Sequence, residues 1–420
     1  MKSIAVIGGG ITGVTTAYAL AKRGFDVTLF EQNRYAAMET SFANGGQLSA
    51  SNAEVWTHWS TIMKGMKWML KNDAPLLVNP KPSWHKLSWF MEFIANIPHY
   101  ERNTIETAKL AVAARQHFFA WANAEGLDFN SEKRGILHIY RDKKGFDHAG
   151  RVSQLLAAGG LDRRAVTPEE MRAIEPTLAG TYYGGYYTES DSTGDIHKYT
   201  VGLAAAAERL GVRIRYGQQV QRVSSNGQIA RVQVRDDTGE STHTFDGMVV
   251  CAGVGSRDMA AQLGDRVNVY PVKGYSITVN LLDEASQQAA PWVSLLDDET
   301  KLVTSRLGVD RFRVAGTAEF NGVNKDIRAD RIRPLIDWVN QCFPGVNTRQ
   351  VVPWAGLRPM MPDMMPRVGR GKKANVFYNT GHGHLGWTLS AGTADLIANT
   401  VQAVSQPVAT VVHGHAMAKA

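Results

Sequence analysis

The first thirty-one residues constrain the fold more than any other part of the chain. They combine two apolar runs, a Gly-x-Gly-x-x-Gly turn, a helical segment and a terminal acid. In chain order these are residues 4–7, then Gly8, Gly10 and Gly13, a helix over about 11–23, and residues 27–30 followed by Glu31. Gly8 permits a tight turn, Gly10 lets a pyrophosphate approach the backbone, and Gly13 lets the helix pack on the strand. The helix N-terminus favours the negative pyrophosphate, and Glu31 suits ribose hydroxyls. The pattern predicts an adenine dinucleotide site, whereas a glycine turn in an unrelated α/β protein is the weaker alternative.

The composition restricts the class of protein. The 420 residues are enough for two domains, and 44% hydrophobic with 20% charged residues are ordinary for a globular protein. The net charge of +7 is spread without a basic run, so nucleic acid is not an expected partner. The two cysteines, Cys251 and Cys342, make neither a disulfide framework nor a metal site, which favours a reducing compartment. No uninterrupted apolar run of eighteen residues predicts a spanning helix, and the glycine motif is too close to the N-terminus for a removable signal.

A second glycine-rich turn helps to decide which dinucleotide binds. Residues 381–386 follow an apolar strand and precede the last helix. Such a turn directs backbone donors and a helix N-terminus at a ligand, an arrangement that favours a reduced flavin, whereas a nicotinamide enzyme needs little from its C-terminus. The turn therefore favours FAD. A capping turn without a ligand is the alternative reading of these residues.

Alternating strands and helices predict an α/β fold. We expect a Rossmann-like FAD-binding domain together with a discontinuous, mainly antiparallel β-sheet plus helices that forms a substrate domain. The expected FAD-binding parts are 1–50, 100–128, 185–260 and 350–405, and the substrate-binding parts are 129–184 and 261–349. Residues 51–99 form a helical segment rich in tryptophan and lysine, and 406–420 form a polar tail.

Five separated blocks resemble a known family over essentially the whole chain. The chain resembles the FAD-dependent oxidoreductases of the D-amino acid oxidase and glycine oxidase class, and within it the bacterial D-amino acid dehydrogenases. The blocks are residues 39–47 (ETSFANGGQ), 70–76 (LKNDAPL), 270–278 (YPVKGYSIT), 354–363 (WAGLRPMMPD) and 379–388 (NTGHGHLGWT). The resemblance implies oxidative deamination of D-amino acids to 2-oxo acids and ammonia.

The resemblance also implies which residues hold the cofactor. Relatives with covalently attached flavin use a cysteine in the region that matches residues 356–363, where this chain has none, so we expect non-covalent FAD. Val220 and Gly253 are expected at the adenine and the diphosphate, and Lys273 near the flavin ring. The full set is Gly8, Gly10, Ile11, Thr12, Gly13, Glu31, Gln32, Ser41, Asn44, Gly45, Gly46, Gln47, Val220, Gly253, Lys273, Gly383, His384, Leu385 and Gly386.

The expected chemistry needs an anchor for the substrate carboxylate. The planar guanidinium of arginine binds a carboxylate through two parallel hydrogen bonds, and Arg358 within the fourth block is the candidate. A structural arginine at a turn is the alternative. Tyr275 is expected either to line the pocket or to pack. No general base is assigned, since an amine that binds neutral needs none. His382 and His384 share no helix face, so metal ligation is not expected.

The electron acceptor is the least defined expectation. Residues 55–100 hold half of the tryptophans with several lysines, a pattern typical of peripheral attachment to an anionic membrane near a quinone. Filling of a core or an entrance is the alternative for these tryptophans. We expect a cytoplasmic protein, with peripheral attachment to the inner membrane as an extension. A glycine, sarcosine or cyclic imino acid oxidase or dehydrogenase is the second functional reading, and a non-catalytic flavin-binding module is a distant third.

Overall fold

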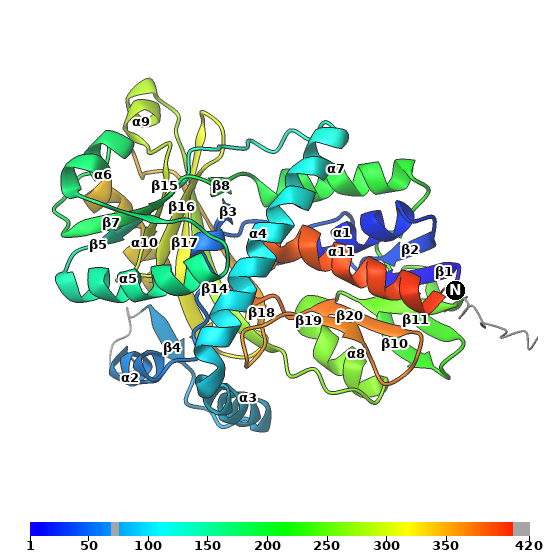
Figure 1. Ribbon diagram of the computed structural model, residues 1–420. Coiled ribbons are helices and arrows are strands. Elements are labelled where there is room, and N and C mark those ends of the chain that lie inside the picture. The colour runs from blue at the N-terminus through cyan, green and yellow to red at the C-terminus, as the bar shows by residue number, and fades with distance from the viewer. Residues whose placement is uncertain (69–74, 406–420) are drawn as a thin grey trace, which may run out of the picture.

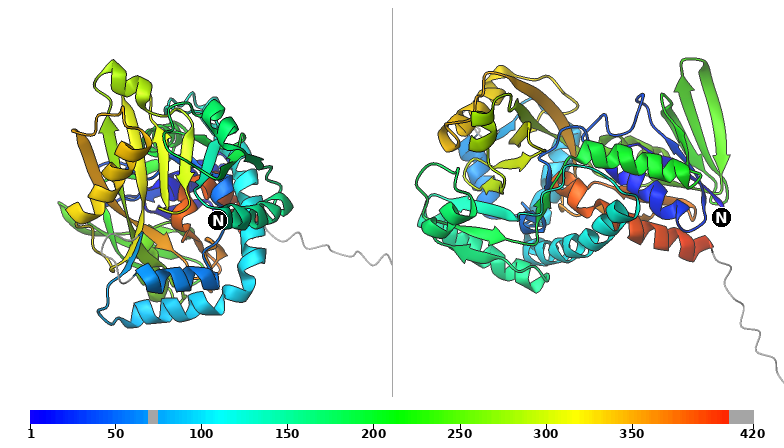
Figure 2. Two further views of the ribbon diagram at one scale, coloured as in Figure 1. Left: turned by 90° about the vertical axis from the view of Figure 1, so that its left-hand side faces the viewer. Right: turned by 90° about the horizontal axis from the view of Figure 1, so that it is seen from above.

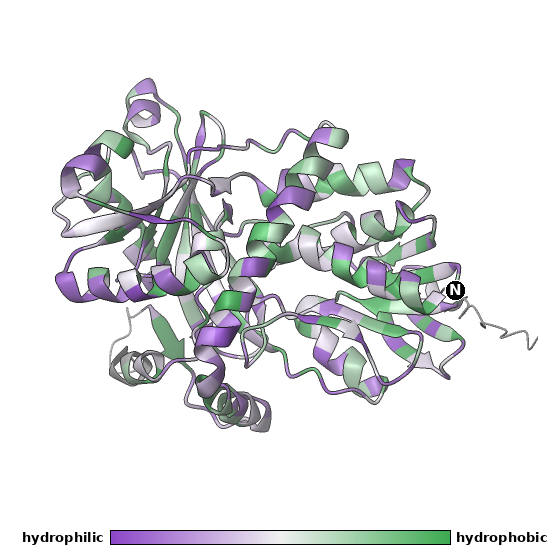
Figure 3. Cartoon of the chain, viewed as in Figure 1, coloured by the Kyte–Doolittle hydropathy of each residue, from purple (hydrophilic) through white to green (hydrophobic). Residues whose placement is uncertain are grey.

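The computed structural model describes residues 1–68 and 75–405. Figures 1 and 2 show two lobes, each built around one β-sheet, with the long helix α4 (Tyr100–Ala124) crossing between them. Hydrophobic residues concentrate in the central strands and on the inner sides of the helices (Figure 3). The sheet of one lobe is mainly parallel and that of the other is mainly antiparallel.

The six-stranded sheet of the first lobe has the order β19-β20-β13-β1-β2-β9. All neighbours are parallel except β19 and β20, which are antiparallel. This is the doubly wound order that places a ligand at the carboxyl ends of the central strands. The strands are β1 (Ser3–Ile7), β2 (Asp26–Phe30), β9 (Arg213–Arg215), β13 (Gly247–Val250), β19 (Arg367–Arg370) and β20 (Val376–Thr380).

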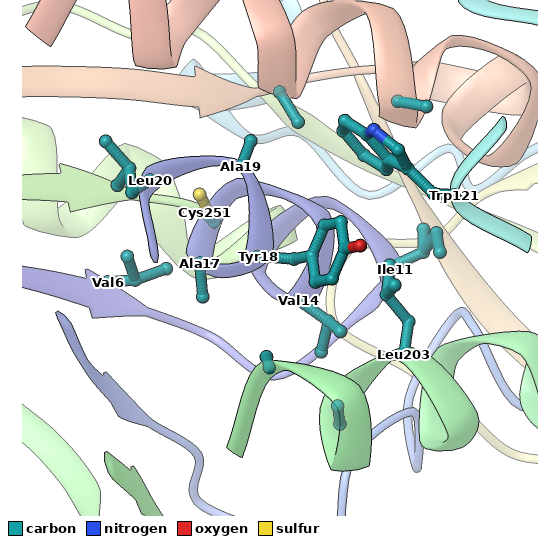
Figure 4. Packing of buried hydrophobic residues seen from close by; sticks show 14 of the residues in the cluster. Val6, Ile11, Val14, Ala17, Tyr18, Ala19, Leu20, Trp121, Leu203 and Cys251 are labelled. Atoms are coloured by element: carbon teal, nitrogen blue, oxygen red, sulfur yellow. The ribbon is translucent and has the colours of Figure 1, made fainter. Parts of the chain in front are cut away.

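Helix α1 (Ile11–Ala21) lies at the centre of the first lobe. It packs between α7 (Ile196–Arg209) and α11 (Gly386–Ser405), which are far from it in sequence (Figures 1 and 4). Tyr18 contacts the Trp121 ring of α4 with 5.2 Å between centroids, and Leu203 of α7 belongs to the same buried cluster. Burial of this cluster fixes the N-terminus of α1 at the edge of the sheet.

The second lobe contains a nine-stranded sheet. Its order is β18-β14-β17-β16-β15-β5-β7-β6, with β4 paired to β17, and most neighbours are antiparallel. The strands are β4 (Leu76–Val78), β5 (Ile136–Tyr140), β6 (Arg164–Val166), β7 (Gly184–Thr188), β14 (Tyr270–Asn280), β15 (Ser294–Asp297), β16 (Leu302–Arg306), β17 (Arg311–Phe320) and β18 (Val351–Met360).

Helices and smaller sheets complete the lobes. Helix α10 (Ala329–Cys342) packs on one face of the large sheet, and α3 (Trp84–Ala95) packs against β14. The remaining helices are α2 (Trp59–Trp68), α5 (Lys143–Ala158), α6 (Pro168–Ile174), α8 (Ser256–Gln262) and α9 (Glu284–Ala289), with 3-10 turns η1 (Ala50–Asn52), η2 (Ile97–His99), η3 (Gly253–Gly255) and η4 (Gly383–Leu385). The small sheets are β10 (Gln219–Ser225), β11 (Ala230–Asp236) and β12 (Gly239–Phe245), and β3 (Gln47–Leu48) with β8 (Ser192–Thr193).

The expected boundary at residue 350 differs from the sheet topology. Strand β18 pairs with β14 along ten residues of the large sheet, so it belongs to the second lobe rather than to the expected FAD-binding part. The chain returns to the first lobe only at β19. The alternation of apolar residues does not tell which of the two sheets β18 belongs to, because a strand that follows a long connection can pair in either sheet. The tail from 406 and part of the block 70–76 lie outside the described residues.

Candidate active site

One cavity of about 830 Å³ extends between the two lobes. Its walls come from the carboxyl ends of β1 and β2, the loop 39–47, the turn before α11, and one face of the nine-stranded sheet. Residues separated by more than 300 positions therefore border the same space. The cavity includes the sequence regions expected to hold the cofactor.

The glycine turn after β1 can be built only with glycines. Gly8 has φ of +106°, and a Cβ there would lie 2.6 Å from the carbonyl oxygen of Cys251. A Cβ on Gly13 would lie 1.8 Å from the carbonyl oxygen of Gly8. Gly13 does not line the cavity; it allows the helix to pack on the turn, as expected. Gly10, Ile11 and Thr12 line the cavity at the start of α1, and the N-terminus of a helix attracts an anion.

Glu31 ends β2 and is buried at the same edge of the sheet. Its Oε2 accepts a hydrogen bond of 2.6 Å from the Gly9 N–H, and its Oε1 accepts one of 2.8 Å from the Asn33 N–H. Burial raises the pKa of Glu31, while the hydrogen bonds from Asn33 and Gly9 act in the opposite direction. The carboxylate borders the cavity beside Gln32, which suits hydroxyl donors of a ribose. The sequence and the geometry agree on the position of this acid.

The loop 39–47 closes one side of the cavity. Ser41 Oγ accepts from the Ile11 N–H at 3.0 Å, which ties the loop to the start of α1. A Cβ on Gly45 would meet Val303 at 2.6 Å, so this loop lies directly against β16 of the other lobe. The expected residues of the loop that border the cavity are Ser41, Asn44, Gly45, Gly46 and Gln47.

The turn before α11 forms the opposite side. Gly381 and Gly383 have φ of +78° and +58°, and the turn leads through η4 into the helix. Gly383, His384, Leu385 and Gly386 all line the cavity, as do Val220 and Gly253 at the other end. Backbone donors thus surround the space at both ends. A long, glycine-lined cavity with helix N-termini at two places fits FAD.

The two histidines of this turn are uncharged at neutral pH. Burial lowers the pKa of His382 to about 3 and that of His384 to about 4. His382 Nε2 contacts Thr393 Oγ1 at 2.9 Å, and the His384 ring stacks on Trp56 with 4.9 Å between centroids. Among residues 1–68 and 75–405 no group of histidine, cysteine and acidic side chains could hold a metal ion. Both rings therefore shape the turn and its cavity wall.

Arg358 lies on β18 and its half-buried guanidinium borders the cavity. Nη1 donates to the carbonyl oxygen of Thr317 at 2.7 Å and Nη2 donates to that of Gly316 at 3.3 Å. The side chain crosses β14 at Gly274, where a Cβ would lie 2.3 Å from Nη2. Burial lowers the pKa of Arg358 to about 10, and no acidic side chain pairs with it in the described part of the chain.

Tyr275 lines the cavity, which is one of its two expected positions, whereas Lys273 differs from the expectation. Lys273 was expected near the flavin ring, but it does not line the cavity: it is fully buried, and its Nζ donates to Asn324 Oδ1 at 2.7 Å and lies 3.4 Å from Glu319. The Tyr275 hydroxyl donates to Glu319 Oε2 at 2.9 Å, so the ring rather than the hydroxyl borders the cavity. Lys273 is directed to Asn324 and Glu319 instead, and the pairing of β14 with β17 is irregular between Lys273 and Tyr275.

The cavity also includes residues that sequence reasoning missed. They come from η1 and the loop after it, from β5, from α5 and from the segment before β6. These residues are Glu54, Trp56, His138, Tyr140, His148 and Arg163. No local motif marks them, because only strand pairing brings β5 beside β15.

The family model described as "FAD dependent oxidoreductase" (DAO) matches residues 3–400. The chain belongs to this family. Its cofactor is FAD, as the second glycine turn predicted, and the resemblance and the α/β fold class are confirmed. The protein is an FAD-dependent oxidoreductase.

Relatives in this family cover nearly the whole chain. A protein named D-amino acid dehydrogenase 3 from Mesorhizobium japonicum is 62% identical over 97% of this chain and 98% of its own length. A D-amino acid dehydrogenase from Paramagnetospirillum magneticum is 40% identical over 95% of this chain and 94% of its own.

Solved structures show the same fold. L-proline dehydrogenase from P. horikoshii matches with a TM-score of 0.74 and 16% identity, covering 96% of this chain and 93% of that one. Glycine oxidase from Geobacillus kaustophilus matches with a TM-score of 0.72 and 20% identity, covering 97% and 96%. At these identities the likeness concerns the fold alone.

Proposed function

We propose that the protein oxidises D-amino acids to 2-oxo acids and ammonia and passes the electrons to a quinone or another respiratory carrier. Support comes from the D-amino acid dehydrogenases to which the chain is 62% and 40% identical over almost its full length. The observation that carries the proposal is the cation of Arg358, which faces the same cavity as the dinucleotide-binding glycines and has no acidic partner in the described part of the chain.

The Arg358 guanidinium is held in a position from which it can bind an anion. Two strand carbonyls hold Arg358 in place and use only one donor on each terminal nitrogen. The remaining donors suit a carboxylate, which binds arginine bidentately. The partial burial of the guanidinium strengthens such a pair relative to one in bulk water. Arg358 therefore binds the substrate carboxylate and orients the Cα–H bond.

The chain's own residues carry out binding and orientation. FAD, when bound, supplies the acceptor for the hydride that leaves Cα. The amino acid loses two electrons and two protons overall, and water converts the resulting imine to the 2-oxo acid and ammonia. His384 and His382 are uncharged at neutral pH, so neither brings a second cation beside the amine. No side chain is required as a base if the amine binds neutral.

The proposal includes peripheral attachment of the protein to a membrane that contains the quinone. No helix in residues 1–68 and 75–405 is long and apolar enough to cross a membrane. Helix α3, at the lower edge in Figure 1, instead has apolar residues on two faces. Trp89 and Phe93 are buried in the protein. The outer face carries Trp84, Leu87, Met91 and Ile94, exposed by 75%, 51%, 56% and 45%.

Some of the tryptophans and lysines of residues 55–100 are placed for membrane contact, and others are buried in the protein core. Trp59 and Trp84 are exposed, as a membrane contact needs, whereas the Trp89 Nε1–H donates to the carbonyl of Met360 inside the protein. Lys86 is buried and its Nζ donates to the Lys81 carbonyl, so it cannot reach a lipid head group. The side chains of Lys64, Lys67, Trp68 and Lys71 lie outside the described part.

An anaerobic substrate panel tests the proposed reaction. The purified yellow protein is mixed with D- and L-alanine, D-phenylalanine, D-proline, glycine and sarcosine, and loss of the flavin absorbance near ~450 nm is followed. Bleaching by D-amino acids alone is expected, with slow recovery in air and fast recovery with a quinone analogue. Bleaching only by glycine, sarcosine or an imino acid would move the assignment to the second reading. No bleaching by any of them would contradict the proposal.

A further inference from the structure

The strands β17, β16, β15 and β5 are neighbours in the large sheet (Figure 1), and one face of them forms the floor of the cavity. Strand pairing places residues of these strands in rows across the floor. One row that lines the cavity is Ala315, Val303, Leu296 and His138. A second set of lining residues lies two positions from the first along the chain: Thr317, Lys301, Asp298 and Tyr140, of which Lys301 and Asp298 lie in the turn between β15 and β16. The floor is therefore a trough that runs across the strands.

An arginine lies at each end of this trough. The Arg358 guanidinium lies over Gly274 of β14, one strand beyond β17. At the other end, Arg163 Nη2 donates to the Tyr140 hydroxyl of β5 at 3.0 Å, and its guanidinium lies 4.7 Å from the centroid of the Tyr186 ring. From β14 to β5 there are four strand spacings of about 4.8 Å, so the trough is about 19 Å long.

Arg163 is the charged group at its end that lacks an ionic partner. The described residues offer it no ion pair, and its buried Nε has no hydrogen-bond acceptor. The other charges there are paired: Lys301 Nζ lies 2.5 Å from Asp298 Oδ1, and Glu54 Oε1 lies 3.2 Å from His148 Nε2. The N–H donors of a guanidinium without an ionic partner are available to an oxygen acceptor in the cavity that it borders.

We infer that Arg163 forms a second binding subsite, which takes the far end of a long substrate side chain through a carboxylate or carboxamide oxygen. The inference rests on the proposed function, since Arg358 must hold the α-carboxylate. A methyl side chain held at Arg358 leaves most of the trough empty. A side chain of six carbons extends about 7 Å from Cα, and the arginine contacts at both ends add about 4 Å each, which approaches the trough length.

Two matched series of substrates test the inference with the wild-type holoenzyme and an artificial electron acceptor. One series ends in a carboxylate: D-aspartate, D-glutamate, D-2-aminoadipate and D-2-aminosuberate. The other ends in a methyl group: D-2-aminobutyrate, D-norvaline, D-norleucine and D-2-aminooctanoate. At equal chain length, kcat/KM of the carboxylate series should gain on the methyl series as the chain grows, to about tenfold or more at the longest pair. D-glutamine and D-citrulline show whether a neutral oxygen suffices.

Variants assign the effect to Arg163. Arg163→Leu should remove the preference for the carboxylate series through KM. Arg163→Lys should keep part of it for carboxylates. Arg164→Leu is the matched control, because the neighbouring Arg164 is exposed and pairs with Glu170 on the surface at 3.1 Å.

The outcomes separate the two proposals. If D-alanine and D-norleucine are oxidised but terminal carboxylates or amides bring no gain at any length, the subsite is refuted and the proposed function stands. Equal losses for both series in Arg163→Leu would also refute it, since they indicate a structural role. If no D-amino acid is oxidised, the proposed function fails and the inference fails with it. The comparison of the two substrate series with the wild-type enzyme tests the subsite even if a variant does not fold.

Discussion

At the scale of single residues, the placement of Arg358 depends on a glycine in the neighbouring strand. The guanidinium crosses β14 at Gly274, and any side chain there would occupy the same space. The strand carbonyls of Gly316 and Thr317 then hold the two terminal nitrogens. Thr317 has φ of +57°, an uncommon conformation for a residue other than glycine, which turns its carbonyl toward the guanidinium. The position of the Arg358 guanidinium therefore depends on the absence of a side chain at Gly274 and on the backbone conformation of Thr317.

Gly274→Ala should displace this cation without removing it. A Cβ at 2.3 Å from Nη2 forces the guanidinium away from its carbonyl partners. We expect KM for D-alanine to rise about tenfold or more, because a well-placed charged hydrogen bond contributes about 1.5–3 kcal/mol, while FAD content stays unchanged. Steady-state kinetics and flavin absorbance of the purified variant measure both.

A double variant checks that the effect acts through Arg358. In Gly274→Ala/Arg358→Leu the loss should be no greater than in Arg358→Leu alone, since the two changes remove the same interaction. Additive losses would mean that Gly274 matters for another reason, such as the pairing of β14 with β18.

Residue roles that follow from local rules could be predicted from the sequence. Gly8, Gly13 and Glu31 lie where the dinucleotide motif places them, because the turn, the helix start and the strand end are all local. Lys273 could not be placed, since the face of a strand that points to a cavity depends on its neighbours. Arg163 carries no motif and reaches the cavity only through pairing of β5, β6 and β7.

At the scale of elements, periodicity identified helices better than sheets. The helix expected over about 11–23 is α1 (Ile11–Ala21). Sheet membership is set by partners distant in sequence, so β18 was assigned to the other lobe. Helix α3 shows a further limit: both its faces are apolar, and the sequence does not tell which one is buried.

The outer face of α3 should bind lipid. Wild-type protein is expected to sediment with anionic liposomes at low salt. Leu87→Ser/Met91→Ser should weaken binding about tenfold or more, because each side chain loses apolar area worth about 1 kcal/mol or more in the bilayer interface. Flavin content and activity with a soluble dye serve as folding controls.

A matched substitution on another surface distinguishes lipid contact from general stickiness. Leu282 is 69% exposed and follows β14, so Leu282→Ser should leave liposome binding unchanged. If wild-type protein stays in the supernatant, or if both variants lose binding equally, the outer face of α3 is not a membrane contact.

At the scale of the whole molecule, the two lobes divide the work. The six-stranded sheet presents the glycine turn and Glu31, and the nine-stranded sheet presents Arg358 and the trough. The cavity lies where the lobes meet, so the proposed positions of FAD and of the amino acid share one space. The family, the fold class and the cofactor could be predicted because motifs report them, whereas the shape of the substrate cavity depends on pairing between strands more than 150 residues apart, as between β5 and β15.

Anaerobic stopped-flow reduction by D-alanine, compared between wild type and Arg358→Leu, tests the central claim most directly. Arg358 binds the substrate carboxylate in this account, so the substrate concentration for half-maximal bleaching should rise at least about tenfold in the variant, with FAD retained. L-alanine should bleach neither protein. An unchanged concentration dependence in Arg358→Leu, or a wild-type flavin that D-alanine does not reduce, would contradict the account.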